Sequence, residues 1–198
     1  MLNNNLKERI KSMDALTDFD DTIIPTHMIY RHFWNNFSHL PLDKKLKVSV
    51  ELFEALAVYK STGNLFGIFS LFQGYSDEEI KQVHCQEINP LWASLAMEHD
   101  YKNIGIVSRN ARQFIELPVK EINNLIEGLH LEIIVANELE FVDGVCTGES
   151  EIFVNENTLW DMVKDKPYIC GRDELKLFKK KEVPYVAEKI DYLFICSK

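Results

Sequence analysis

The second half of this chain alternates short apolar segments with segments of helical pattern, and this alternation limits the possible folds more than any other feature. Apolar runs of strand length occur at 103–108, 131–136 and 168–170, and a further run, 13–18, lies near the N-terminus. Strands that alternate with helices form a mostly parallel sheet with helices on both faces. We therefore predict a fold of the α/β class.

Turn and cap signals subdivide the alternating part of the chain. Asn110 is expected to cap a helix that breaks at Pro118 and resumes as far as Gly128. Residues 140–147 contain an Asp-Gly pair between two apolar-rich arms, which predicts a β-hairpin. The remaining expected elements are helices around 158–164 and 174–180 and strands at 183–187 and 192–195.

From residue 25 to residue 100 the pattern is helical. Asp43 is expected to cap a long helix, Ser76 and Glu79 match a capping box, and Asn89 followed by proline predicts another helix start. The long helix has an apolar side that we expect to pack in the core. The residues of that side are Leu46, Val50, Phe53, Leu56 and Ala57.

Composition excludes several classes of partner. Lys and Arg number 22 against 31 Asp and Glu, a net charge of −9, which argues against binding to duplex nucleic acid or to anionic lipid. Apolar residues make up 46% of the chain, as in globular proteins, and no run reaches the length of a membrane helix. The N-terminus has no apolar signal core, so we expect a cytoplasmic protein.

Cysteine spacing points to the same compartment. The four cysteines lie far apart and form no C-x-x-C pair, which argues against a disulfide framework and a thiolate zinc site. Reduced cysteines are expected in a cytoplasm. The residues are Cys85, Cys146, Cys170 and Cys196.

Acidic residues follow the first predicted strand, at Asp18 and Asp20, with Thr22 next in the same loop. Ligands of parallel α/β sheets bind beyond the carboxyl ends of strands. Two neighbouring carboxylates in a partly buried site repel each other, and Mg²⁺, which prefers oxygen ligands, can neutralise them. A carboxylate there can also attack phosphorus while a second one protonates the leaving oxygen. The alternative is a solvated acidic loop.

A hydroxyl group, that of Ser108, stands at the end of the second predicted strand. Together with the amides of a following helix N-terminus, such a hydroxyl can bind phosphate. Serine is equally an ordinary residue at a helix start, so this position by itself indicates little.

Three segments resemble motifs of the haloacid dehalogenase (HAD) superfamily. Residues 16–23, LTDFDDTI, resemble its motif I, and residues 104–108, IGIVS, resemble motif II. Residues 135–148 resemble the strand and hairpin of the phosphoserine-phosphatase-like branch. The resemblance extends over the chain from residue 13 onward.

The resemblance implies a Rossmann-like HAD core, formed by residues 1–24 and 101–198, with a mostly parallel sheet. The helical segment 25–100 stands where that branch has its C1 cap, inserted after the first strand. The implied activity is Mg²⁺-dependent hydrolysis of a small phosphomonoester through an aspartyl-phosphate intermediate.

Individual roles follow from the same resemblance. Asp18 would be the nucleophile and Asp20 the general acid and base, while Thr22 and Ser108 would assist in positioning and phosphate binding. A dehalogenase proper usually lacks the second aspartate, so Asp20 favours phosphatase chemistry.

The family's third motif, a lysine, has no clear counterpart in this chain. Residues 153–158 contain no lysine, and Lys164 and Lys166 are expected near the other end of the next strand. The lysine offsets the negative charge of phosphate and aspartate. Arg109 or Arg172 can replace it, because a guanidinium binds phosphate bidentately. Both arginines can equally be surface residues.

The fourth motif also departs from the family pattern, because Arg172 stands at its usual first acidic position. Asp173 is one residue further on and is predicted to bind Mg²⁺, although aspartate is also a good helix N-cap. Glu174 is a weaker candidate for the same role. The predicted metal ligands are Asp18, Asp20 and Asp173.

The leading hypothesis is therefore a phosphatase acting on a small phosphorylated metabolite, with a cap that selects the substrate. The alternative is a catalytically impaired HAD-like protein that binds a ligand or a partner protein. Phosphotransfer to another hydroxyl is not separable from hydrolysis by sequence. At the start of the cap, His27, Arg31 and His32 can contact the leaving group or simply be exposed on a helix.

Overall fold

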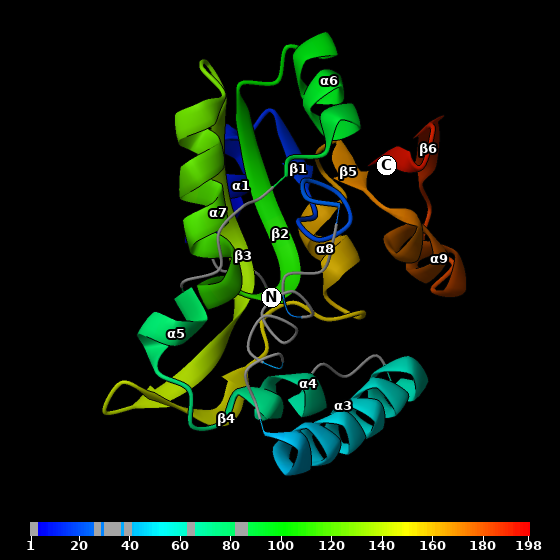
Figure 1. Ribbon diagram of the computed structural model, residues 1–198. Helices are drawn as coiled ribbons and strands as arrows, with labels where there is room; N and C mark the ends of the chain where they lie inside the picture. Colours follow the sequence, from blue (N-terminus) through cyan, green and yellow to red (C-terminus); the bar gives the residue numbers. More distant parts are fainter. Residues whose placement is uncertain (1–3, 26–28, 30–36, 38–40, 63–65, 82–86) are drawn as a thin grey trace.

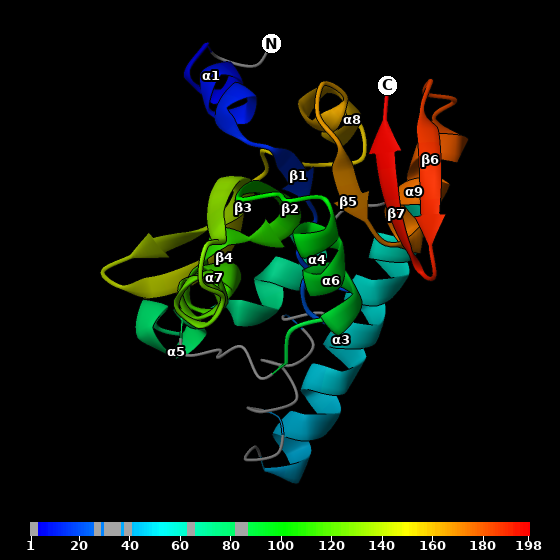
Figure 2. The same ribbon diagram turned by 90° about the horizontal axis from the view of Figure 1, so that it is seen from above.

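A central sheet organises the structure, a computed structural model in which residues 4–25, 29, 37, 41–62, 66–81 and 87–198 are described. The strands are β1 (Ala15–Thr17), β2 (Asn103–Ala111), β3 (His130–Val142), β4 (Val145–Glu151), β5 (Tyr168–Cys170), β6 (Val186–Ile190) and β7 (Leu193–Ser197). Their order in the sheet is β4-β3-β2-β1-β5-β7-β6 (Figures 1 and 2). The central strand is thus β1, which lies between β2 and β5.

Helices surround this sheet. They are α1 (Asn4–Ser12), α3 (Leu42–Thr62), α4 (Phe66–Phe69), the 3-10 helix η1 (Ser70–Phe72), α5 (Asp77–Lys81), α6 (Pro90–Glu98), α7 (Arg112–Leu125), α8 (Leu159–Val163) and α9 (Arg172–Lys180). Figure 2 shows α1 and α8 on one side of the sheet and α6 and α7 on the other. No helix in the described part of the chain is both long and apolar enough to cross a membrane.

The sheet is parallel at its centre, as the alternating sequence pattern predicts. Strands β3, β2, β1 and β5 run parallel, whereas β4 pairs antiparallel with β3, and β7 pairs antiparallel with both β5 and β6. The predicted hairpin is confirmed between β3 and β4. Asp143 and Gly144 have φ angles of 52° and 78°, the left-handed conformation that a tight hairpin turn requires.

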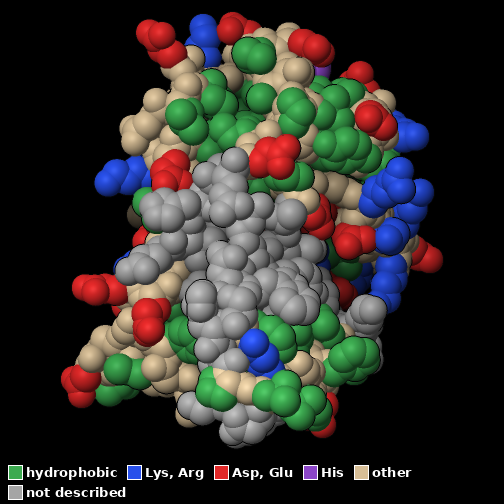
Figure 3. Space-filling view, viewed as in Figure 1, with side chains coloured by type: hydrophobic (Ala, Val, Ile, Leu, Met, Phe, Trp, Pro, Cys, Tyr) green, Lys and Arg blue, Asp and Glu red, His purple; other side chains and the backbone are tan. Residues whose placement is uncertain are grey.

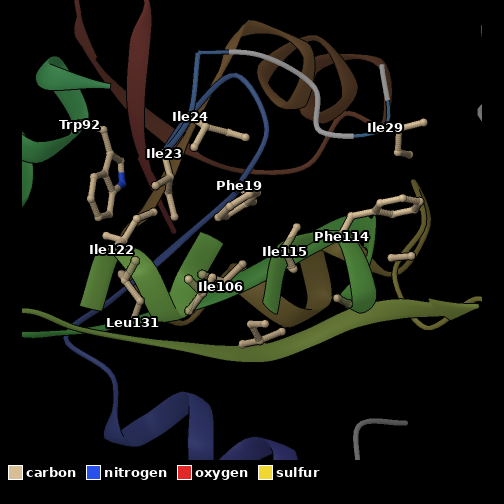
Figure 4. Packing of buried hydrophobic residues seen from close by; sticks show 14 of the residues in the cluster. Phe19, Ile23, Ile24, Ile29, Trp92, Ile106, Phe114, Ile115, Ile122 and Leu131 are labelled. Carbon is tan, nitrogen blue, oxygen red and sulfur yellow. The ribbon is translucent and has the colours of Figure 1, made fainter. Parts of the chain in front are cut away.

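Each face of the sheet buries its own apolar cluster. One cluster lies on the side of α6 and α7 and includes Phe19, Trp92 and Phe114 (Figure 4). The other includes Leu16 and Phe178, together with residues of α1 and α8. Coverage of both faces explains why the central strands read as continuous apolar runs rather than as alternating ones.

Two details of the region after β2 differ from prediction. Strand β2 continues past Ser108 to Ala111, so Asn110 does not cap a helix. Helix α7 then runs from Arg112 to Leu125 without a break, although Pro118 lies inside it. Proline removes one backbone hydrogen bond, but α7 buries a full apolar face, and tertiary packing of this kind supplies most helix stability in proteins.

Two predicted helix starts in the segment between β1 and β2 are confirmed. Ser76 and Glu79 form a reciprocal capping box, in which the Ser76 amide donates to Glu79 Oε2 at 2.8 Å and the Glu79 amide donates to Ser76 Oγ at 3.2 Å. Asn89 Oδ1 accepts the amide of Leu91 at 3.1 Å, with Pro90 at the first position of α6.

The predicted burial of the apolar side of α3 is wrong for its largest residues. Leu46, Val50 and Phe53 are 63%, 58% and 80% exposed. Figure 3 shows apolar side chains gathered near the lower edge of the molecule, where α3 lies. Helix α3 instead buries the small residue Ala55, which Gly67 of α4 approaches closely. Close approach of two helices requires small side chains, so the large apolar ones point elsewhere.

Cys146, Cys170 and Cys196 are buried thiols. The Sγ atoms of Cys170 and Cys196 lie 3.8 Å apart on the paired strands β5 and β7. Cys85 lies outside the described residues.

Candidate active site

Asp18 occupies the carboxyl end of the central strand and is only 7% exposed. Its amide continues the pairing of β1 with β5 by donating to the carbonyl of Ile169 at 3.0 Å. Thr17 Oγ1 donates to the Asp18 carbonyl at 2.9 Å and accepts the indole Nε1–H of Trp92 at 3.2 Å. Backbone pairing and the buried Thr17–Trp92 contact therefore fix the position of the Asp18 backbone.

The loop that follows β1 folds back on itself. Phe19 is fully buried in the apolar cluster of Figure 4, and its carbonyl accepts the amide of Ile23 at 2.9 Å. Asp21 has a φ of 54°, a left-handed conformation that aspartate tolerates better than most residues. Thr22 is fully buried, and Asn89 Nδ2 donates to its carbonyl at 2.8 Å. The N-cap of α6 thus also anchors this loop.

A bulge brings the end of β2 toward the same loop. The register of β2 with β3 shifts between Ser108 and Ala111, which leaves Arg109 and Asn110 in the bulge. Asn137 of β3, fully buried, donates from Nδ2 to the Arg109 carbonyl at 2.6 Å. Bulges near functional sites redirect side chains that regular pairing would place elsewhere.

Side chains of the bulge contact both neighbouring strand ends. Asn110 Nδ2 donates to Asp20 Oδ2 at 2.8 Å, beyond β1. Arg109 Nη2 and Glu174 Oε1, beyond β5, form an ion pair at 2.5 Å, with the two side chains 16% and 5% exposed. Ser108 is 1% exposed, and its Oγ accepts the amide of Asn110 at 3.1 Å. Asp20, Ser108 and Arg109 are therefore brought together at the carboxyl edge where Asp18 lies.

Glu174, rather than Asp173, faces this site. Asp173 has a side chain that is 69% exposed and forms an ion pair with Lys176 at 2.8 Å. Helix α9 buries Glu174, Leu177 and Phe178, which share one helical face because they are three and four residues apart. Asp173 precedes that face by one position, so the predicted metal role of Asp173 gains no support from its placement.

Burial and neighbouring charges both act on the pKa of the Asp18 carboxyl. Burial, first, and the negative charge of Glu174, second, raise the pKa of the Asp18 carboxyl well above its usual range. The Arg109 guanidinium acts in the opposite direction on the same pKa. Asp18 must be ionised to act as a nucleophile, so the site needs further positive charge.

Oxygen atoms converge beside Gly171, the residue between β5 and α9. A Cβ atom placed on Gly171 would lie 3.6 Å from Glu174 Oε2 and 3.7 Å from both the Asp21 carbonyl and Thr22 Oγ1. Thr22 Oγ1 is buried and has no hydrogen-bond partner among the described residues. Hard oxygen donors of this kind suit Mg²⁺.

A metal ion at this edge would need backbone oxygens and water as well as carboxylates. The described residues contain no group of three or more His, Cys, Asp or Glu side chains arranged to hold a metal ion. Mg²⁺ usually keeps several waters and takes one or two carboxylates. Asp18 and Glu174 are the two buried acids that can meet this requirement.

Lys164 and Lys166 lie away from the site, and the sequence-based expectation placed them near the other end of the strand. Lys166 Nζ donates to the carbonyls of Lys11 and Met13, before β1 begins, and therefore lies at the amino end of the sheet. Lys164 Nζ pairs with Asp161 at 2.6 Å. Because the side chain of Arg172 is exposed, Arg109 is the described cation best placed to act on Asp18.

Comparison with known proteins identifies the fold class. No protein-family profile matches the sequence, and no curated protein matches it significantly. A HAD family hydrolase from Salmonella enterica serovar Typhi matches the structure with a TM-score of 0.52 and 14% identity, over 85% of this chain and 61% of that one. This likeness shows a HAD-type fold, as the motifs predict. The chain spans 61% of the length of that hydrolase.

Two further solved structures are similar over most of both chains. A phosphoserine phosphatase, solved as a phospho-aspartyl intermediate analogue, has a TM-score of 0.46 and 20% identity, covering 86% of this chain and 72% of its own. A phosphoserine phosphatase from T. onnurineus has a TM-score of 0.48 and 13% identity, covering 84% and 76%.

Sequence reasoning missed the residues that support the site. Asn110 was expected to cap a helix, and Asn137 had no expected role, yet both are buried asparagines with several hydrogen bonds at the bulge. The available signal was a pair of polar residues, Arg109 and Asn110, between the apolar run of β2 and the apolar face of α7. A bulge cannot be distinguished from a helix cap by such a signal.

Proposed function

We propose that this chain is a Mg²⁺-dependent phosphatase that hydrolyses a small phosphomonoester through an aspartyl-phosphate on Asp18. The observation that supports the proposal most strongly is the convergence of buried polar residues at the carboxyl end of β1. Asp18 lies there with Asp20 and with the Arg109–Glu174 ion pair. The HAD-type fold and the motif resemblance favour this chemistry over other uses of two aspartates.

The proposed reaction has two steps. An oxygen of Asp18 attacks phosphorus, the bond to the substrate oxygen breaks, and that oxygen takes a proton from Asp20. A water molecule then gives a proton to Asp20 and attacks phosphorus, which releases phosphate and restores Asp18. Ser108 Oγ–H can donate to the phosphoryl oxygens, since its observed contact with the Asn110 amide uses the oxygen only as an acceptor.

Positive charge at the site has two proposed sources. Mg²⁺ would be held by Asp18, by the main-chain carbonyl of Asp20 and by Glu174, and would neutralise charge on the transferring phosphoryl group. Arg109 would take the place of the family lysine, because it lies within the same buried charge cluster. In this proposal Glu174 replaces Asp173 as the acid of the fourth motif.

The proposed cap comprises residues 25–100, inserted into a core of residues 1–24 and 101–198. Figure 1 shows α3 and α4 beyond the carboxyl end of β2, the side on which Asp18 lies. Helix α6, also within this segment, packs on the sheet through Trp92. A cap over this edge would exclude water and select a small phosphorylated substrate. His27, Arg31 and His32 lie outside the described residues.

The proposal is tested by measuring phosphate release from a broad panel of phosphomonoesters, with Mg²⁺ and with excess chelator. We expect turnover of at least one substrate, and its loss on removal of Mg²⁺. If no substrate is turned over and no phosphate mimic binds in a Mg²⁺-dependent manner, the chain is instead a HAD-like binding protein. Transfer of phosphate to an added alcohol would indicate a phosphotransferase.

Glu174→Gln is expected to weaken Mg²⁺ affinity by at least about 10-fold, because it removes one of two buried carboxylates at the site. Isothermal titration calorimetry measures this directly. Asp173→Asn is the matched control, since the Asp173 side chain is exposed and paired with Lys176. Unchanged affinity in Glu174→Gln, or an equal loss in Asp173→Asn, would remove Glu174 from the proposed metal site.

A further inference from the structure

We infer that Asn110 is a positioning residue that orients the carboxyl group of Asp20 for proton transfer to the leaving oxygen. This inference rests on the proposed function and assigns a role to a residue outside the motifs. Asn110 is 3% exposed and lies in the bulge of β2. Its Nδ2 donates to Asp20 Oδ2 at 2.8 Å, across to the loop that follows β1.

The carboxamide of Asn110 is locked in one orientation. Its Oδ1 accepts the amide of Ala111 at 2.7 Å. If the carboxamide were flipped, Nδ2 would face the Ala111 amide, and two donors would oppose each other. The backbone amide of Asn110 in turn donates to Ser108 Oγ at 3.1 Å. Asn110 can therefore present only a donor to Asp20.

The bulge itself is anchored by a second buried asparagine. Asn137 Nδ2 donates to the carbonyls of Arg109 at 2.6 Å and Val154 at 3.1 Å. Asn137 Oδ1 accepts the amides of Phe153 at 2.9 Å and Val154 at 2.8 Å. A positioning residue acts only if its own backbone is held, and this network holds the bulge at Arg109, next to Asn110.

A fixed donor favours one oxygen of Asp20 as the carrier of the proton. Since Nδ2–H of Asn110 donates to Asp20 Oδ2, that oxygen accepts whether the carboxyl is ionised or neutral. Because a carbonyl oxygen accepts better than a hydroxyl oxygen, this contact favours Oδ1 as the oxygen that carries the proton of neutral Asp20. Asp20 is partly exposed on a loop, and the contact with Asn110 restricts rotation of its carboxyl group by holding Oδ2 toward the bulge of β2.

General acid catalysis matters most for poor leaving groups, which provides a readout that a purely structural role would not change. We expect Asn110→Ala to lower kcat/KM for β-glycerol phosphate, an alkyl ester, by about 100-fold. For 4-nitrophenyl phosphate, whose leaving group needs no proton, we expect a loss of only about 3-fold, from disturbance of the loop. Asp20→Asn should show the same selectivity, and combining the two substitutions should add little further loss.

Asn123→Ala is the matched control. Asn123 of α7 also uses its carboxamide for two contacts, accepting the Leu131 amide at 2.7 Å and donating to the Leu131 carbonyl at 2.9 Å, but it is not at the site. We expect equal kcat/KM changes for both esters in this variant. Asn110→Ser removes the donor facing Asp20 without adding charge, so it serves if Asn110→Ala does not fold.

The outcomes separate this inference from the function on which it rests. Equal losses for the two esters in the Asn110 variants, while the wild-type protein is active and Asp20→Asn is selective, would overturn the role of Asn110 alone. Failure of the wild-type protein to release phosphate from any ester with Mg²⁺ would overturn the phosphatase proposal first. Selective loss in the Asn110 variants supports both.

Discussion

Asp18→Asn is expected to reduce phosphate release by at least about 1,000-fold, because an amide can neither attack phosphorus nor form the covalent intermediate. The same substitution should not unfold the protein. Asp18 is 7% exposed, and burial together with Glu174 raises the pKa of its carboxyl well above its usual range. Its ionised form is therefore unfavourable in the folded state, and a neutral amide of equal size removes that cost.

The sign of this stability effect can be measured. A raised carboxyl pKa means that the folded protein loses stability as the pH rises above the ordinary aspartate range and Asp18 is forced to ionise. In chelator, at neutral pH, Asp18→Asn should therefore melt at the same temperature as the wild-type protein or higher. Steady-state phosphate release and thermal unfolding check the two halves of the prediction. Retained turnover in Asp18→Asn would mean that another group is the nucleophile.

Trp92→Ala should lower the free energy of unfolding by about 3–5 kcal/mol, the usual cost of truncating a large buried aromatic side chain. Trp92 is fully buried in the cluster of Figure 4 and joins α6 to β1 by donating to Thr17 Oγ1. Thr17 Oγ1 in turn donates to the Asp18 carbonyl. The fraction of Trp92→Ala that stays folded should therefore also lose activity, because the hydrogen bonds that position Asp18 are weakened.

Urea denaturation measures this loss, and two further variants define its origin. Trp92→Phe keeps most of the apolar volume and removes the indole donor, so it isolates the hydrogen bond to Thr17. Phe53→Ser removes an aromatic side chain that is 80% exposed on α3 and should change stability by about 0.5 kcal/mol or less. If Phe53→Ser costs as much as Trp92→Ala, the exposed side of α3 is buried in solution.

Local patterns predicted several parts of the fold well. The capping box at Ser76, the helix start at Asn89 and the Asp-Gly hairpin between β3 and β4 all lie where their residues indicate. Each depends on contacts within a few residues of the chain, so the sequence contains everything that these features need.

Features that depend on a distant partner were predicted less well. Periodicity places Leu46, Val50 and Phe53 on one side of α3, but only the neighbouring helix decides which side is covered, and α4 covers the side of Ala55. The same holds for Asp173, whose side chain points to solvent because α9 buries the next face of the helix.

For the candidate site, too, the sequence predicted the position of the residues but not their contacts. Its position was set by the order of strands along the chain, since acids that follow an apolar strand of a parallel sheet lie at its carboxyl edge. Only this rule was needed to place Asp18, Asp20 and Ser108 at that edge. The partners of these residues needed the fold, because Arg109 meets Glu174 across 65 residues of sequence and Asn110 meets Asp20 across 90.

Sequence alone therefore determined the class of fold, the edge of the sheet at which the acids gather, and the local starts and turns of many elements. Tertiary structure alone decided that β2 bulges at Arg109 and Asn110, that Glu174 rather than Asp173 faces inward, and that α3 exposes its large apolar residues. The physical reason is the distance along the sequence over which each kind of interaction acts. Backbone capping, turn geometry and apolar periodicity act within a few residues, whereas hydrogen bonds and ion pairs between strand ends depend on how distant segments pack.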